Sequence, residues 1–416
     1  MTVQTEAPFR NPFRPGAGHM PPHLAGRQKE LSEFCRLLEQ ETILENLVLT
    51  GLRGVGKTVL LEVFKPLAMQ AGWLWVGTDL SESTSVTEEK LAIRILADLA
   101  VVTSSIVVRT ESVSKPGFTS LPLEVPSMLD YTALVSVYTS TPGLVSDRLK
   151  AVLELAWAYL AKEGRRGLIF AYDEAQNLAD RGDKDEYPLS LILDVFQSIQ
   201  RKGIPFMLAL TGLPTLFPKL VNARTFAERM FRVVFLDRLS QTESREAILT
   251  PIQHANCPVA FTGESVDTIC KHSAGYPYFI QFICREVFDV FIQQAATGTQ
   301  NQVPLDAITR KLDSDFFAGR WAKVTDRQRE LLTVVAVLPR PDIEFTVQEV
   351  VAKAPEVLTT PFSNSHANQM LSALCAAGLI YKNRYGRYSF AVPLLGEFIK
   401  RQLDQGGMQA ILRAPT

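Results

Sequence analysis

The first half of the chain alternates short, continuous apolar runs with longer segments in which apolar residues recur every three or four positions. The short runs predict buried strands, and the periodic segments predict amphipathic helices. The predicted strands cover 47–50, 73–76, 167–172, 206–211 and 233–236. The predicted helices cover 28–41, 57–71, 87–99, 146–162 and 189–201. This alternation of strands and helices predicts an α/β domain with a parallel sheet.

The second half of the chain is dominated by the helical period. Three predicted helices cover 242–255, 263–273 and 278–296, and three more cover 326–337, 346–354 and 365–377. Two β-rich runs, 379–382 and 388–392, follow the last of them. We therefore expect a helical domain and then three helices with a hairpin, which is the outline of a winged helix.

Two segments depart from these patterns. Residues 1–23 hold five prolines, which block helix formation and predict an extended arm. Residues 101–145 are rich in Ser, Thr, Val and Pro, with strand character only over 105–109. We interpret this second segment as an irregular insertion.

Composition narrows the class of protein. The 416 residues are 46% apolar and 21% charged, which is enough core material for two or three domains. The net charge of −1 provides no whole-chain field that would draw the protein onto DNA or an anionic membrane. The longest apolar stretches, such as 204–213, are shorter than the ~18 residues that cross a bilayer. Five cysteines without a CxxC pair, and an amino terminus without an apolar run, favour a cytoplasmic protein.

A glycine-rich segment follows the first predicted strand and precedes a predicted helix. It matches GxxxxGK[ST], the phosphate-binding P-loop, with the residues Gly51, Leu52, Arg53, Gly54, Val55, Gly56, Lys57 and Thr58. Its glycines would turn backbone N–H groups toward phosphate, Lys57 would neutralise β/γ oxygens, and Thr58 would bind Mg²⁺. With Val59, these residues are the predicted ATP- and ADP-binding loop. The alternative is a glycine-rich turn without a ligand.

The strand predicted over 167–172 ends in two carboxylates, Asp173 and Glu174, which is the form of a Walker B element. Ligands of a doubly wound sheet bind at the carboxyl ends of its strands. Asp173 would hold Mg²⁺ through water, and Glu174 would act as the base for the attacking water. The alternative is a helix start with acidic residues that interact with the helix dipole.

Two further groups are candidates for catalysis. Thr211 ends a predicted strand and would contact the γ-phosphate or the attacking water, although a threonine in a turn is the alternative. Arg224, Arg229 and Arg232 precede the fifth strand, and we choose Arg229 as an arginine finger toward a neighbouring subunit. Arginines on a solvated helix face are the alternative for this group.

The remaining polar patterns concern zinc and DNA. His254, Cys257, Cys270 and His272 form HxxC and CxH pairs, but the CxH spacing suits a helix poorly, and we expect no metal. Residues 320–416 hold 12 Lys and Arg against 8 Asp and Glu. The candidate DNA contacts are Asn368 and Gln369 on a helix and Lys382, Arg384 and Arg387 around the hairpin turn. Because the helix offers no cation for phosphate, DNA binding and protein interaction stay equally open.

Several of these segments resemble the AAA+-related ATPases of the origin-recognition and STAND branches. The resemblance covers nearly the whole chain and is carried by LTGLRGVGKTVLL, YDEAQNL, FAERMF, GYPYFIQ, the leading segment PPHLAGR and the closing segments GLIY and FAVPL. It implies the strand order 5-1-4-3-2 in chain numbering, Gly26 and Arg27 near the adenine, and Gly275 and Pro277 of the lid near the nucleotide. Tyr278 stands where origin-recognition ATPases more often have a sensor arginine, which favours the STAND side.

Together these patterns predict a P-loop NTPase fold of the AAA+ type, a three-layer α/β sandwich with a helical lid and a winged helix. The expected boundaries are an arm at 1–23, the ATPase domain at 24–239, the lid at 240–320, the winged helix at 321–405 and a tail at 406–416. The expected function is an ATP-binding, slowly hydrolysing switch that needs Mg²⁺ and has a DNA-binding winged helix. The alternatives are a STAND-like switch that works through self-association or a protein partner, and a binding module with little turnover.

Overall fold

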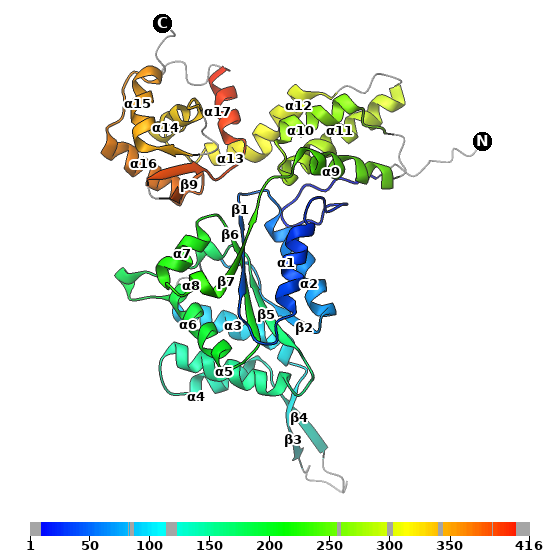
Figure 1. Cartoon of the computed structure of the whole chain (residues 1–416), viewed down its shortest axis with the longest axis vertical. Helices are drawn as coiled ribbons and strands as arrows, with labels where there is room; N and C mark the ends of the chain where they lie inside the picture. Colours follow the sequence, from blue (N-terminus) through cyan, green and yellow to red (C-terminus); the bar gives the residue numbers. More distant parts are fainter. Residues whose placement is uncertain are drawn as a thin grey trace, which may run out of the picture. The chain divides into compact units, whose positions relative to one another are not determined.

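The computed structural model describes residues 10–81, 83, 87–113, 123–255, 259–297, 303–339, 344–384 and 386–404. The chain forms two compact units, which Figure 1 follows from blue to red along the sequence. The α/β unit consists of Gln28–Thr50 and Lys57–Phe235. The helical unit consists of Met1–Arg27, Gly51–Gly56 and Leu236–Thr416.

The α/β unit is built on a five-stranded sheet with the order β2-β5-β6-β1-β7. The strands are β1 (Asn46–Gly51), β2 (Trp73–Val76), β5 (Gly167–Tyr172), β6 (Phe206–Gly212) and β7 (Phe231–Leu236). The pairs β1–β6, β5–β6 and β2–β5 are parallel. Every residue of β1, β5 and β6 is buried, as expected for a sheet that is covered on both faces. The predicted strand order and class of fold are confirmed.

Helices cover both faces of this sheet (Figure 1). One face carries α1 (Gln28–Leu38) and α2 (Lys57–Gln70), and the other carries α3 (Glu88–Thr103), α5 (Val145–Leu160) and α6 (Pro188–Arg201). Shorter helical elements connect the strands, namely η1 (Ala175–Asn177), η2 (Gly182–Lys184), α7 (Leu216–Ala223) and α8 (Ala227–Met230). The three layers are those of the predicted sandwich.

Aromatic side chains fill the two interfaces between the sheet and its helices. Phe34 of α1 stacks on Phe64 of α2, with ring centroids 4.1 Å apart, and meets the edge of Trp75 in β2. On the opposite face Phe170 of β5 packs against Phe196 of α6, with centroids 5.1 Å apart. Alternate residues of a strand point to opposite faces, and this alternation separates the two cores.

Residues 101–145 are more regular than we expected, and the interpretation as an irregular insertion is wrong. Helix α3 continues to Thr103, and two antiparallel strands follow, β3 (Val107–Val113) and β4 (Leu123–Met128). Helix α4 (Tyr131–Ser140) comes next, and the Asp130 side chain caps its first turn by accepting from Ala133 N–H. The β-branched Val and Thr residues of this helix have low helix propensity, which concealed it; the cap and packing of Leu134 and Tyr138 into the core stabilise it.

In the residues that the structure describes, the main part of the helical unit begins with five α-helices and one π-helical turn. They are α9 (Gln241–His254), α10 (Gly263–Ser273), α11 (Pro277–Thr297), α12 (Leu305–Leu312) and α13 (Ala318–Trp321), with the π-helical turn η3 (Asp313–Phe317) before α13. Ser240 caps α9 in a reciprocal capping box with Glu243. Of these elements, α12, η3 and α13 had no counterpart in the prediction.

A smaller module of helices and strands ends the described chain. It comprises α14 (Asp326–Ala336), β8 (Phe345–Thr346), α15 (Val347–Val357), α16 (Asn364–Ala376), β9 (Ile380–Arg384), β10 (Arg387–Phe390) and α17 (Leu395–Asp404). Its three strands form an antiparallel sheet with the order β8-β10-β9. The three predicted helices and the hairpin are present, whereas β8 and α17 were not predicted. Residues 406–416, the expected tail, lie outside the described residues.

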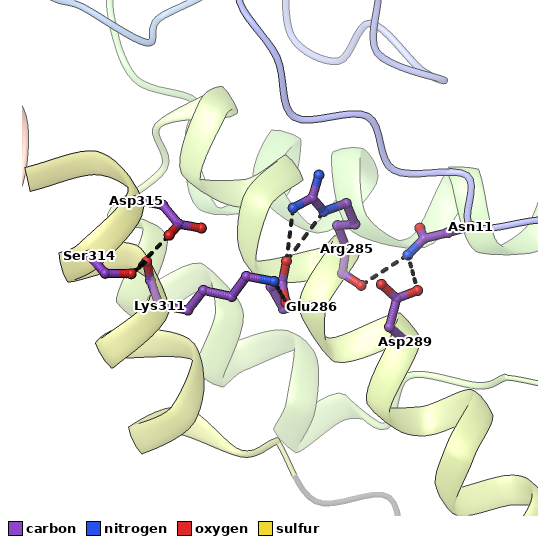
Figure 2. A network of polar contacts seen from close by, with 7 residues as sticks. All are labelled: Asn11, Arg285, Glu286, Asp289, Lys311, Ser314 and Asp315. Carbon is purple, nitrogen blue, oxygen red and sulfur yellow. Dashed lines mark hydrogen bonds and ion pairs between the residues drawn. The ribbon is translucent and has the colours of Figure 1, made fainter.

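The described part of the amino-terminal arm lies on α11 without helix or strand structure of its own. Figure 2 shows the Asn11 amide at this helix, where it donates to Arg285 O at 2.9 Å and to Asp289 Oδ1 at 2.8 Å. Phe13 is 2% exposed and stacks on Phe261. Arg14 N–H donates to Gln281 Oε1 at 3.2 Å. The arm is therefore an integral part of the helical core.

Among the described helices, none combines the length and the apolar character that crossing a bilayer requires.

Candidate functional site

The loop between β1 and α2 has the backbone of an anion-binding turn. Gly54 and Gly56 have φ angles of 79° and 93°, a region that favours glycine. Lys57 and Thr58 are the first residues of α2, and no acidic side chain lies in the first turn of this helix. A helix amino terminus with free N–H groups and a lysine attracts phosphate. Val55 is buried and anchors the loop. Val59 lies in the first turn of α2.

Within the helical unit, several segments hold this loop by its carbonyl groups. Arg27 is buried and donates through Nη2 to Val55 O and to Asp237 O, both at 2.9 Å. Tyr278 N–H, at the start of α11, donates to Gly54 O at 3.1 Å. A Cβ at Gly54 would lie 3.2 Å from the Tyr278 Cβ, so glycine allows the lid helix to approach the loop. The predicted Arg27 is thus in contact with the loop.

The other two predicted lid and arm glycines are tightly packed within the same unit. Gly26 has a φ of +64°, and a Cβ there would lie 2.5 Å from the Glu243 carboxyl carbon. Gly275 has a φ of +77°, and a Cβ there would lie 2.4 Å from Leu239 O. Leu239 N–H donates to Gly275 O at 2.8 Å, and Pro277 begins α11 two residues later. Glycine at both positions allows close approach between backbone segments.

Within the α/β unit, Asp173 collects three hydrogen bonds at the carboxyl end of β5. Its Oδ2 accepts from the Thr58 hydroxyl at 2.5 Å. Its Oδ1 accepts from the Thr211 hydroxyl and, at 2.7 Å, from Glu174 N–H. Asp173 is 4% exposed, and Thr211 is fully buried. The structure therefore brings together the predicted magnesium ligands, Thr58 and Asp173, with the predicted phosphate sensor, Thr211.

Glu174 differs sharply from its neighbour. Its side chain is exposed, and its backbone has a φ of 52°, which is unusual for a residue with a side chain. Strain of this kind is tolerated where the surroundings impose it, and it is common at functional sites. The Glu174 side chain is therefore accessible to solvent directly after the buried Asp173.

A third carboxylate, Asp79, lies at the same edge and was not predicted. The chain after β2 pairs with Asp173, because Leu80 N–H donates to Asp173 O and Asp173 N–H donates to Thr78 O. Partial desolvation raises the pKa of Asp79, and the negative charges of Asp173, Glu174 and Glu62 raise it further. Its position just after a strand of the sheet was the sequence signal that could have found it.

The three arginines before β7 have different environments. Arg224 forms a two-point ion pair with Asp194, with nitrogen–oxygen distances of 2.8 and 2.6 Å. Arg232 Nε lies 3.4 Å from Glu33 Oε2. Arg229, on α8, is exposed and has no ion pair with any described residue. Of the three, Arg229 is thus the one without an ion pair to a residue that the structure describes.

The predicted DNA contacts lie on the exposed surface of the carboxyl-terminal module. Asn368 and Gln369 are exposed on α16, and the Asn368 amide donates to Asn364 O at 3.0 Å. Lys382 is exposed on β9, and Arg384 ends that strand. Arg387 Nη1 lies 3.9 Å from Glu349 Oε2, so one of the three wing cations faces a carboxylate of its own module.

The described residues contain no cluster of three or more His, Cys, Asp or Glu side chains that could hold a metal ion. His254, Cys270 and His272 belong to α9 and α10, and Cys257 lies outside the described residues. Burial raises the pKa of the Cys270 thiol and lowers that of the His272 imidazole, as expected for groups that favour their neutral forms.

Comparisons with known sequences give little information on function. A family model described as a domain of unknown function (DUF8462) matches residues 314–399, from η3 to α17. No curated protein sequence matches the chain.

Solved structures resemble the chain over most of its length. The Walker-type ATPase Paby2304 of Pyrococcus abyssi is 16% identical, with a TM-score of 0.56 over 91% of this chain and 96% of that one. The ORC2 protein of Aeropyrum pernix in its ADP form is 15% identical, with a TM-score of 0.54 over 94% of this chain and 97% of that one. The same protein in its ADPNP-ADP complexes is 12% identical, with a TM-score of 0.53 over the same shares. The chain therefore has the fold of the origin-recognition-like AAA+ ATPases.

Proposed function

We propose that this protein binds ATP together with Mg²⁺ and hydrolyses it slowly, as a molecular switch. The observation that carries the proposal is the convergence on Asp173 of the hydroxyl groups of Thr58, from the start of α2, and Thr211, from the end of β6. The exposed Glu174 carboxylate follows directly. This set of groups comes from three chain segments that parallel strand order brings to one edge of the sheet.

Each residue of the set has a role in this proposal. The N–H groups of the loop from Gly51 to Gly56 and the Lys57 ammonium bind the phosphates. The hydroxyl and carboxylate of Thr58 and Asp173 are hard oxygen donors that suit Mg²⁺, which they would hold directly or through water. A bound Mg²⁺ would supply positive charge beside the phosphates. Thr211, whose hydroxyl donates to Asp173 in the structure, would turn this hydroxyl toward the γ-phosphate when ATP binds.

Glu174 accepts the proton of the attacking water in this scheme. An exposed carboxylate next to a buried one suits this role, because the base must reach a water molecule that the metal-binding carboxylate does not contact. Arg229 is proposed to act in trans, in a homo-oligomer of the ATP-bound form, where its exposed guanidinium stabilises charge in the transition state. The sequence favours the cytoplasm as the place of this reaction.

The nucleotide state is transmitted through the loop to the helical unit. Arg27 donates to Val55 O, and Tyr278 N–H donates to Gly54 O. A change in the loop backbone therefore changes the contacts that the arm and α11 make with the loop. Gly26, Gly275 and Pro277 belong to the same two segments, near the nucleotide in this proposal. Rigid contacts of this kind support a two-state switch.

We propose the winged helix as the output of the switch, with weak DNA binding through Asn368, Gln369, Lys382, Arg384 and Arg387. Three helices, a hairpin and cations in the hairpin support this assignment. A second candidate is a protein-docking role in a STAND-like switch. It is favoured by one specific observation, the approach of Arg387 to Glu349, which reduces the positive charge available for phosphate.

The test is steady-state ATP hydrolysis by the purified protein with Mg²⁺, compared with Glu174→Gln. We expect this substitution to lower kcat by roughly 10²–10⁴-fold. Glu163→Gln, at an exposed carboxylate in the same unit, is the matched control and should retain full turnover. Equal turnover by wild type and Glu174→Gln would rule out the proposed chemistry.

A titration with linear duplex DNA separates the two outputs. If the winged helix binds DNA, DNA raises turnover at low salt and the effect fades at physiological salt. If turnover depends on protein concentration and ignores DNA, the output is self-association or a protein partner.

A further inference from the structure

One side chain of the α/β unit links the proposed catalytic carboxylate to the end of a neighbouring strand. Gln176 lies in η1, two residues after Glu174, and its Nε2 donates to Glu174 Oε2. Its Oε1 accepts from Leu213 N–H at 3.1 Å, just beyond β6. Both ends of one amide are therefore used, one on the Glu174 carboxylate and one on the backbone two residues after Thr211.

The environment fixes this amide in place. A Cβ at Gly212 would lie 2.6 Å from Gln176 Oε1, so a glycine at this position leaves room for the glutamine. The Gln176 carbonyl accepts from Lys219 Nζ of α7 at 2.7 Å. Burial lowers the pKa of this lysine, whereas Asp180 acts in the opposite direction. The backbone and the side chain of Gln176 are thus each held from a different element.

We propose that Gln176 is a positioning residue that sets the orientation of the Glu174 carboxylate and couples it to the segment Thr211–Leu213. This inference rests on the proposed function, since it assigns a partner to the proposed base. The Glu174 backbone is turned by its positive φ, and its carboxylate is exposed. Without the amide, this side chain would rotate freely in solvent, and an attacking water would meet a base in the correct orientation only part of the time.

Gln176 couples the end of β6, where Thr211 is proposed to contact the γ-phosphate, to the Glu174 carboxylate. Thr211 is proposed to meet the γ-phosphate, and the next residues, Gly212 and Leu213, contact the Gln176 amide. A displacement of the end of β6 on phosphate binding therefore moves the group that holds Glu174.

Gln176→Met tests the proposal, because methionine has a similar length and can neither donate nor accept as the amide does. We expect kcat to fall roughly 10–100-fold, with KM for ATP and the affinity for ADP within about twofold of wild type. Gln70→Met, at an exposed glutamine that ends α2, is the matched control and should leave kcat unchanged. A rise in KM at constant kcat, or unchanged kinetics with a lower Tm, would show a purely structural role.

Gln176→Glu provides a readout that a structural role would not change. One carboxylate oxygen still accepts from Leu213 N–H, and the other places a negative charge beside Glu174 in place of a donor. The donor that orients Glu174 is gone while the bond to Leu213 remains, so we expect kcat to fall roughly 10–100-fold, as in Gln176→Met. Wild-type kcat in this variant would overturn the proposal.

The double variant Glu174→Gln/Gln176→Met distinguishes the two levels of the argument. If Gln176 acts through Glu174, its substitution has no further effect on kcat once Glu174 is changed. Full additivity of the two losses would overturn the positioning role. If wild type and Glu174→Gln turn over equally, the proposed function itself fails and the inference fails with it. If Glu174→Gln loses activity and Gln176→Met does not, only the inference is wrong.

Discussion

The carboxyl edge of the five-stranded sheet and the exposed face of α16 with the β9–β10 hairpin both carry polar residues proposed to bind a ligand, but they are organised differently. At the sheet edge, Asp173 is nearly buried and is fixed by two hydroxyl groups and a backbone N–H. On α16, Asn368 and Gln369 are exposed, and the Asn368 amide donates to the preceding turn of its own helix.

This difference shows what each proposed ligand requires. A carboxylate that holds a metal ion must be oriented before the ion and its nucleotide arrive, so burial and hydrogen bonds are expected around it. A surface that binds a polyanion needs free cations instead, and here Arg387 approaches Glu349. The chain therefore supports nucleotide chemistry more strongly than it supports nucleic-acid binding.

The largest effect on this comparison should come from Lys57→Ala. Removal of the ammonium group at the start of α2 takes away a charge-assisted contact to phosphate, and we expect ATP affinity to fall by more than about 100-fold. Titration with a fluorescent ATP analogue measures the loss. Lys65→Ala, at an exposed lysine of the same helix, should bind as wild type does. Wild-type affinity after Lys57→Ala would mean that the loop is an empty turn.

Thr211→Val tests the preorganisation of the sheet edge. Valine preserves the shape of the buried side chain and removes its hydroxyl, so Asp173 loses one of three donors. We expect kcat to fall roughly 10–100-fold with ADP affinity nearly unchanged, because ADP has no γ-phosphate for the hydroxyl to contact. Stopped-time ATPase assays and ADP titration check both values. An equal loss of ADP affinity would instead indicate collapse of the edge.

Glu349→Gln tests DNA binding by the β9–β10 hairpin. The glutamine can still complete the capping box with Thr346, and the substitution removes the negative charge opposite Arg387. If the wing binds DNA, affinity for a linear duplex should rise about two- to threefold and the salt dependence should steepen. Arg387→Ala should lower the affinity for the duplex, and the slope of log affinity against log salt concentration should become shallower by about one unit. Fluorescence anisotropy at two salt concentrations measures both, and no response in either variant would favour a protein partner.

The smallest expected effect is on stability, from Asp79→Asn. The pKa of Asp79 in the folded protein is raised above its ordinary value of 3.8. The contribution of this carboxyl group to stability is therefore fully present below pH 3.8, where the group is protonated, and it is lost as the pH rises through the pKa of the folded state. At pH 7 the asparagine variant should melt higher by less than about 3 °C. Near pH 3.5 the two proteins should melt alike. A lower Tm for the variant at pH 7 would show that the ionised carboxylate has a stabilising partner.

Much of the fold and the central part of the site followed from local sequence. Thr58, Asp173 and Thr211 each stand at the end of a strand or the start of a helix, so a parallel sheet necessarily brings them to one edge. Helix α4 and the β3–β4 hairpin did not follow, because Ser, Thr and Val suit neither pattern clearly and their stability depends on packing. Gln176 did not follow either, because its role depends on the contact between η1 and the end of β6, which no local pattern encodes.

The amino-terminal arm has a consequence for synthesis. Asn11 and Arg14 leave the ribosome well before their partners Arg285, Asp289 and Gln281, which follow more than 260 residues later. Long separations of this kind slow the closure of a structure. During translation the α/β unit can complete its sheet before α11, the helix that the arm packs on, has been synthesised. The helical core can therefore form only late in synthesis. A chaperone that shields Phe13 until α11 has been synthesised would raise the yield of native protein.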